Sequence, residues 1–252
     1  MKVIQHKIHL RFYEELNDFL PGEKRKISFE HTYIDRTSVK DVIESLGVPH
    51  TEVDLILANG KSVGFDYLIN FDDDISVYPV FESLDITDVQ CLRPKPLRNP
   101  KFVADVHLGK LTRYLRMMGF DVLYKNDFDD DEIVKLSLKE KRAILTRDRG
   151  ILKRSKVLHG YWIRSTKVRE QVIEVIKRFD LKNIIKEFSR CIDCNSLLIK
   201  TNKNKILNEL PPKVASSLDE FYRCPECKKN YWEGTHYQKM LSFIQSIKDI
   251  EF

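Results

Sequence analysis

Two hydrophobic periods alternate along the first part of the chain. Apolar residues of one parity, which mark a half-buried strand, recur in four stretches: residues 4–12, 27–29, 53–57 and 75–81. Between the second and third stretch, Val39, Val42 and Ile43 follow the spacing of a helix, and Ser38 is expected to cap it. The order strand, strand, helix, strand, strand is that of a β-grasp, or ubiquitin-like, fold, which we predict for residues 1–86.

The predicted β-grasp segment resembles the sulfur-carrier branch of that fold. Carriers of that kind end in a free Gly-Gly, because the terminal carboxylate is their reactive group. Here the chain continues past Glu82 into further protein. We therefore expect an interaction or scaffold role for this segment, with a protein partner docking on it, and no carrier chemistry.

A proline-rich stretch marks the end of the first domain. Pro94, Pro96 and Pro100 fall within residues 87–100, a density that suits an extended linker. After the linker, short apolar stretches alternate with segments of helical period. This alternation predicts a parallel sheet flanked by helices, an α/β domain over residues 101–182.

Acidic residues stand near the ends of two of the predicted strands. Asp105 closes the first strand of the α/β domain, Asp148 follows the third, and Asp131 begins the helix between them. Chemistry in open α/β sheets collects beyond the carboxyl ends of the strands, where three carboxylates would repel one another without a hard cation. We therefore predict that the three aspartates bind Mg²⁺ or Mn²⁺ for phosphodiester hydrolysis. The structural alternatives are a turn at Asp148 and a helix cap at Asp131, a cap that Asp129 or Asp130 could supply equally well. As a metal ligand, Asp131 could be replaced by Asp129, Asp130 or Glu132.

The helix expected over residues 108–118 combines an apolar stripe with a basic face. Its basic residues recur at intervals of three, on the side away from the stripe: Lys110, Arg113 and Arg116. Arg147 and Arg149, which flank Asp148, add to this set. We predict that all five bind a phosphate backbone. The alternative is an ordinary amphipathic helix with a solvated basic side.

Four of the five cysteines form two Cys-x₂-Cys pairs, Cys191 with Cys194 and Cys224 with Cys227. Such pairs present four thiolates to one tetrahedral ion, so we predict a structural Zn²⁺ in a zinc ribbon over residues 188–252. Aromatic and basic residues around the second pair suggest stacking on unpaired bases. The alternative is that Trp232 and the nearby tyrosines form the small core of the ribbon.

The net charge of +5 hides an asymmetry along the chain. Residues 1–90 carry 9 Lys and Arg against 17 Asp and Glu, whereas residues 99–180 carry 19 against 12. The basic part favours a polyanion such as RNA as partner, with a solvated basic surface as the alternative. The sequence has no apolar run of roughly 18 residues and no signal-peptide pattern, so we expect a cytoplasmic protein without membrane contacts.

Four segments resemble the Mut-seven C-terminal ribonuclease family: KFVADVHLGKLTRYLRMMGFDVLY, DDDEIVKLSLKEKRAILTRDRGIL, RCIDCNSLL and RCPECKKNYWEGTH. That family joins a PIN-like nuclease domain to a zinc ribbon, and some members carry an N-terminal ubiquitin-like segment. The resemblance implies that Asp105 is the first-strand acid of a PIN site, Asp131 the helix-start acid and Asp148 the acid of the Thr-x-Asp motif. A further acid of many PIN sites has no match in this sequence.

Together these features predict a multidomain α+β and α/β protein: an N-terminal β-grasp, a central PIN-like parallel sheet with flanking helices and a C-terminal zinc ribbon. The expected function is a metal-dependent ribonuclease acting as an endonuclease, with RNA contacts from the zinc ribbon. The alternatives are a non-catalytic RNA-binding adaptor and a protein-docking scaffold. Cleavage that depends on a divalent metal separates the first function from the second, and a pull-down with residues 1–86 alone tests the third.

Overall fold

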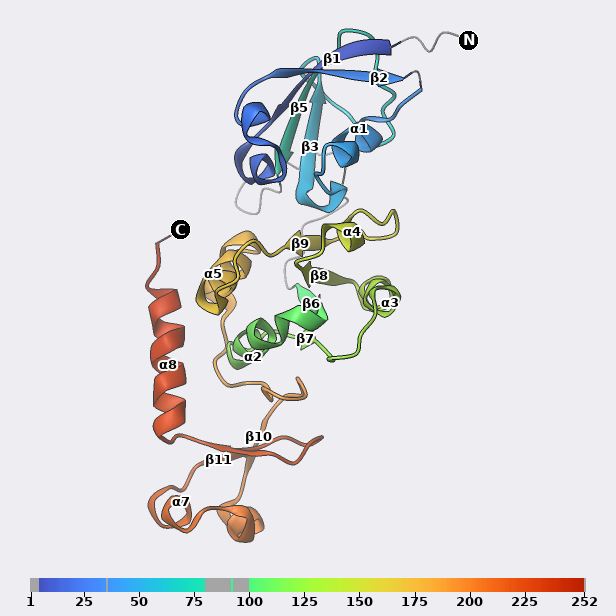
Figure 1. Ribbon diagram of the computed structural model, residues 1–252. Helices are drawn as coiled ribbons and strands as arrows, with labels where there is room; N and C mark the ends of the chain where they lie inside the picture. The colour runs from blue at the N-terminus through green and yellow to red at the C-terminus, as the bar shows by residue number, and fades with distance from the viewer. Residues whose placement is uncertain (1–4, 35, 80–91, 93–99, 252) are drawn as a thin grey trace. The chain divides into compact units, whose positions relative to one another are not determined.

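The computed structural model describes residues 5–34, 36–79, 92 and 100–251 (Figure 1). The chain divides into two compact units: Met1–Asn99 with Ser137–Trp162, and Pro100–Leu136 with Ile163–Phe252. The expected linker lies outside the described residues except for Leu92 and Pro100. Cys91 and the outer ends of the first and last expected β-grasp strands lie outside them as well. In the described part of the chain, no helix is long and apolar enough to cross a bilayer.

The first unit contains a five-stranded sheet in the order β2-β1-β5-β3-β4. Strands β1 and β5 are parallel, whereas β1 with β2 and β3 with β5 are antiparallel. This topology, with α1 packed on the sheet in Figure 1, confirms the predicted β-grasp. The strands are β1 Gln5–Phe12, β2 Phe29–Ile34, β3 Val53–Ala58, β4 Lys61–Ser62 and β5 Asp74–Pro79; the helices are η1 Glu14–Phe19, η2 Gly22–Lys24, α1 Val39–Ser45 and η3 His50–Glu52.

Local sequence signals set the boundaries of these elements. The Ser38 hydroxyl accepts a hydrogen bond of 3.1 Å from the amide of Asp41, which caps α1. Gly47, with φ +97°, follows the helix in the left-handed conformation that ends many helices. Asn59 and Gly60 both have positive φ and form the tight turn between β3 and β4. The apolar faces predicted from the periodicity, including Ile8, Leu10 and Phe12, form the buried core of this sheet.

A four-stranded sheet has the order β7-β6-β8-β9. Strand β6 is parallel to β7, and β8 is parallel to β9, as expected for an α/β domain. Its elements are β6 Lys101–Ala104, η4 Val106–Leu108, α2 Gly109–Met117, β7 Val122–Leu123, α3 Asp130–Glu140, β8 Arg142–Thr146, α4 Arg149–Leu152, β9 Gly160–Trp162 and α5 Val168–Arg178. The short strands agree with the short apolar runs of the sequence.

The second unit continues into a three-stranded antiparallel sheet in the order β10-β11-β12. The interval between the two cysteine pairs contains an inserted helical segment with its own small core, in which Ile206, Leu210 and Phe221 are buried and Trp232 packs against them. The elements are η5 Lys182–Ile184, β10 Ile199–Thr201, α6 Lys203–Ile206, η6 Leu207–Glu209, α7 Pro212–Ser217, β11 Phe221–Arg223, β12 Asn230–Trp232 and α8 Thr235–Lys248.

The C-terminal helix α8 packs against elements that precede the ribbon. The rings of Tyr114 in α2 and Phe243 in α8 lie 4.5 Å apart between centroids. The Lys248 ammonium pairs with the carboxylate of Glu187, and the Lys182 ammonium donates to the carbonyl oxygen of Ile250 at 2.7 Å. The ribbon and the helices α2 and α5 therefore belong to one compact unit.

Candidate metal centre and nuclease site

Each Cys-x₂-Cys pair forms the same tight turn. The amide of Asn195 donates to the carbonyl oxygen of Cys191 at 3.0 Å, and the amide of Lys228 donates to that of Cys224 at 3.1 Å. Asn195 and Lys228 both adopt positive φ, 74° and 63°, so each chain reverses after its second cysteine. This repeated geometry is local, because each turn is closed by hydrogen bonds within six residues of sequence.

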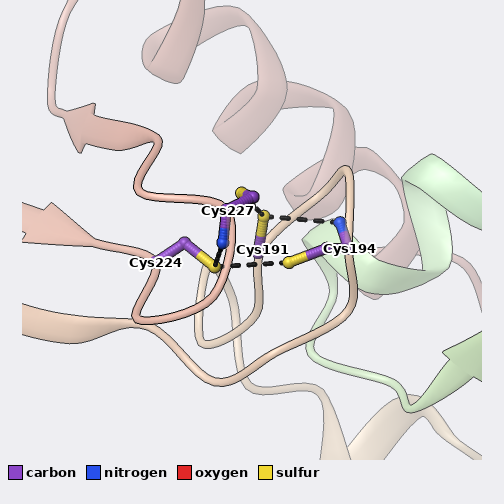
Figure 2. Close-up of side chains that lie close together, drawn as sticks. All are labelled: Cys191, Cys194, Cys224 and Cys227. Atoms are coloured by element: carbon purple, nitrogen blue, oxygen red, sulfur yellow. Dashed lines mark hydrogen bonds between the residues drawn. The ribbon is translucent and has the colours of Figure 1, made fainter.

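The two turns bring four thiols to one point (Figure 2). All four sulfur atoms lie within 4.8 Å of one another; the Cys191 and Cys227 sulfurs are 3.5 Å apart, and those of Cys194 and Cys224 are 3.3 Å apart. A tetrahedral zinc ion with bonds of about 2.3 Å places its sulfur ligands about 3.8 Å apart. The cluster therefore has the dimensions and donor set of a four-thiolate metal site.

The electrostatics of the thiols also fit a cation. Burial raises the pKa of the Cys227 thiol to about 12. Burial acts in the same direction on Cys194, but hydrogen bonds with Ser196 and the neighbouring thiols outweigh it and lower its pKa to about 6. Four thiols this close cannot all ionise without a bound cation, because the negative charges of neighbouring thiolates repel one another. A divalent ion bound among them would favour the thiolate form of each.

Arg116 binds the first cysteine turn to α2. Its side chain is 3% exposed, and its guanidinium donates to the carbonyl oxygen of Asp193 at 2.6 Å and to that of Val122 at 2.8 Å. The expectation that Arg116 lies on the exposed basic face is therefore corrected. At about 100° per residue, Arg116 falls on the flank of the apolar stripe rather than opposite it, and the cysteine turn covers that flank.

Asp105 occupies the carboxyl end of β6, as predicted, and its side chain is only 8% exposed. The segment that follows it is held by Tyr124, whose hydroxyl donates to the carbonyl oxygen of Val106 at 3.0 Å. A Cβ atom at Gly109 would lie 2.6 Å from that hydroxyl, so a larger residue there would have to displace the Tyr124 side chain. Sequence reasoning missed both Gly109 and Tyr124, because their contact joins β7 to the start of α2.

Asp131 lies in the first turn of α3 and is exposed. The cap of that helix is Asp129, whose side chain accepts a hydrogen bond of 2.8 Å from the amide of Glu132. The structure therefore assigns the capping role that the sequence left open among these acids to Asp129. Asp105 and Asp131 belong to the second compact unit.

Asp148 belongs to the first unit and lies two residues after the end of β8. It caps α4, because its carboxylate accepts a hydrogen bond of 2.7 Å from the amide of Gly150. Its own amide donates to the Thr146 hydroxyl at 2.8 Å. The Thr-x-Asp motif therefore closes its own turn, and the carboxylate remains exposed at the end of the strand.

The other predicted phosphate contacts differ in exposure. Lys110 and Arg113 are exposed on α2, and the Arg113 guanidinium lies 3.8 Å from the Asp193 carboxylate. Arg147 is exposed, whereas Arg149 is half-buried with its guanidinium carbon 3.9 Å from the ring centroid of Trp162.

The aromatic residues around the second cysteine pair divide between the two alternatives that the sequence left open. The Tyr231 hydroxyl lies 3.1 Å from the Cys191 sulfur, and Trp232 packs on the small core, so both are structural. Tyr222 and His236 are exposed. His236 is not one of the four residues of the thiol cluster.

These features define a protein that joins a ubiquitin-like module, an α/β domain with parallel strand pairs and a four-cysteine metal-binding group. The chain belongs to the Mut7-C RNAse family: the family model of the Mut7-C RNAse domain matches residues 100–244, and that of the Mut7-C ubiquitin domain matches residues 5–85. Both matches confirm the resemblance seen in the sequence. No curated protein and no solved structure matches the chain.

Proposed function

We propose that this chain is a metal-dependent ribonuclease that cuts RNA internally. The observation that supports the proposal best is the nearly buried carboxylate of Asp105 at the end of β6, inside a Mut7-C RNAse domain. Chemistry in open α/β sheets collects beyond the carboxyl ends of the strands, and carboxylate oxygens at that edge are ligands that a hard cation prefers.

The proposed metal ligands are Asp105, Asp131 and Asp148. When bound, Mg²⁺ or Mn²⁺ would supply a hydroxide nucleophile and stabilise negative charge on the phosphate. The residues of this chain would do the rest. Lys110, Arg113 and Arg147, all exposed, would bind the RNA backbone and orient the scissile phosphate, with Arg149 as a further contact.

The four thiolates are proposed to bind a structural Zn²⁺. The first cysteine turn contacts α2 through Arg116, so the metal would stabilise the helix that presents Lys110 and Arg113. With four protein ligands, such a site leaves no open position for substrate, which separates its role from that of the carboxylates.

One observation favours the RNA-binding adaptor as a second candidate. The Asp148 carboxylate already caps α4, which is a sufficient structural reason for an acid at that position. In the adaptor, the same basic residues would bind RNA without cleavage.

The test compares cleavage of circular and linear RNA by the full chain with Mg²⁺, with Mn²⁺ and with EDTA. Asp105→Asn and Asp148→Asn should each reduce cleavage by at least about a hundredfold, because each loses a metal ligand. Asparagine is as good a helix cap as aspartate, so Asp148→Asn should keep α4 intact. Asp127→Asn, which removes an exposed acid from the loop before α3, is the matched control and should cleave like the wild type.

Cutting of the circular RNA identifies an endonuclease, since the circle has no ends. Wild-type cleavage rates in both aspartate variants would place the activity elsewhere or in a contaminant. Binding of RNA without metal-dependent cleavage would favour the adaptor.

A further inference from the structure

The β-grasp module contacts the segment that contains Asp148. All of these contacts lie within the first compact unit. They join η1 and η3 of the β-grasp to α4, β9 and the loop between them.

The first contact is on the backbone of β9, an edge strand of the four-stranded sheet. Glu52 of η3 is 1% exposed, and its carboxylate accepts a hydrogen bond of 2.6 Å from the amide of Trp162. An edge strand exposes unpaired amides to other chains, and a buried acceptor covers one of them here. Glu52 therefore joins the β-grasp to the edge of the four-stranded sheet.

The second contact is on the loop between α4 and β9. His50 is buried, its Nε2 donates to the carbonyl oxygen of Val157 at 2.8 Å, and its Nδ1 lies 2.6 Å from the Glu44 carboxylate. The ammonium of Lys153 donates to the carbonyl oxygen of Glu44 at 2.7 Å. Buried polar groups are thus paired across this contact, as expected for a permanent interface.

The third contact surrounds Asp148 itself. The Trp162 indole contacts both sequence neighbours of Asp148. The indole Nε1 donates to the carbonyl oxygen of Arg147 at 3.2 Å, and the centroid of the indole ring lies 3.9 Å from the Arg149 guanidinium carbon. Phe19 of the β-grasp packs on Trp162 with 4.9 Å between ring centroids, and it lies 5.0 Å from the same guanidinium carbon. A guanidinium stacked on rings keeps the plane of its N–H donors fixed, which is the arrangement used for phosphate binding.

We propose that the β-grasp module is a working part of the nuclease site, in which Phe19 and Trp162 are positioning residues for Arg149 and for the turn at Asp148. The part that concerns phosphate binding rests on the proposed function. In this arrangement the η1 and η3 face is occupied by the chain itself. An outside protein would have to dock elsewhere on the β-grasp.

The test uses the full chain with Phe19→Leu, Trp162→Phe and Arg149→Ala. Phe29→Leu is the matched control, because Phe29 also packs on the β-grasp core but lies in β2. The first measurement is amide hydrogen exchange of residues 146–152. Exchange should increase in Phe19→Leu and stay at the wild-type rate in Phe29→Leu, because only Phe19 supports that turn.

The second measurement is RNA affinity. Phe19→Leu should weaken binding about fivefold, in the range of a lost ring–guanidinium contact, and Trp162→Phe, which keeps a ring, should weaken it less. The double variant Phe19→Leu with Arg149→Ala should bind RNA no more weakly than Arg149→Ala alone. The two substitutions remove the same contact, between the Phe19 ring and the Arg149 guanidinium, so their effects should not add.

Equal exchange of residues 146–152 in Phe19→Leu and Phe29→Leu would overturn the proposal. So would additive losses of affinity in the double variant. If the wild-type chain neither binds nor cuts RNA while the exchange result holds, the positioning role stands and the proposed ribonuclease function falls.

Discussion

Arg116 donates a hydrogen bond of 2.6 Å to the main-chain carbonyl oxygen of Asp193, and this contact joins helix α2 to the first cysteine turn. Three carbonyl oxygens in all accept from this guanidinium, those of Val122, Ile192 and Asp193. Burial lowers the pKa of Arg116, and the acidic groups around it, Cys191 first, oppose that shift. The residue is therefore a structural cation, and its loss can be separated from a loss of RNA contacts.

Replacing Arg116 by Ala should destabilise the protein by about 3 kcal/mol, because buried carbonyl groups lose their donors. Arg113→Ala on the same helix is the matched control. Arg113 is exposed, so the free energy of unfolding of the Arg113→Ala variant should differ from that of the wild type by less than about 0.5 kcal/mol. Denaturant unfolding measures both values. Similar stabilities of the two variants would contradict the structural role of Arg116.

Zinc content tests the thiol cluster. The purified chain should contain one tightly bound Zn²⁺, and Cys224→Ser should lose most of it, because three thiolates hold the ion more weakly than four. Removal of the metal should increase proteolysis between the two cysteine pairs. Elemental analysis measures the metal, and the control is Tyr222→Phe, an exposed residue beside the cluster. Metal-free protein purified without chelator would exclude this site.

The salt dependence of RNA binding tests the exposed face of α2. Lys110→Ala with Arg113→Ala should reduce the slope of log affinity against log salt by roughly 1.5, since each phosphate contact contributes about 0.7–0.9. The sequence alone predicted three contacts, and the burial of Arg116 leaves two. Lys177→Ala, an exposed lysine on α5, is the control. An unchanged slope in the double variant would show that this face does not meet RNA.

The ion pair of Glu187 and Lys248 gives a dependence of stability on pH. The hydrogen bond from Lys248 lowers the pKa of Glu187 from its ordinary value of 4.5. The stability that comes from the lowered pKa of Glu187 is fully present above pH 4.5. It is lost as the pH falls through the pKa that Glu187 has in the folded protein. We expect a contribution below about 1 kcal/mol, because both side chains are partly solvated.

Glu187→Gln should remove this part of the pH dependence, whereas Glu226→Gln, an exposed glutamate in the second cysteine pair, should keep it. Thermal unfolding between pH 3 and pH 7 measures the difference. Identical pH profiles for wild type and Glu187→Gln would show that the pair contributes nothing to the docking of α8.

The sequence by itself determined the features that depend on neighbours along the chain. The period of Ile8, Leu10 and Phe12 placed a strand, Ser38 and Gly47 bounded a helix, and each Cys-x₂-Cys turn closes through its own hydrogen bonds. Period, caps and tight turns act within a few residues, so a single sequence is enough to recognise them.

Only the tertiary structure decided which residues are covered by distant parts of the chain. Arg116 continues the three-residue spacing of Lys110 and Arg113, yet the turn at Asp193 buries it. In the same way, Phe19 and Trp162 meet at Arg149 although more than a hundred residues separate Phe19 from the other two. The burial of a side chain depends on which surfaces the fold brings together. Hydrophobic periodicity does not show which distant segment covers the polar side of a helix.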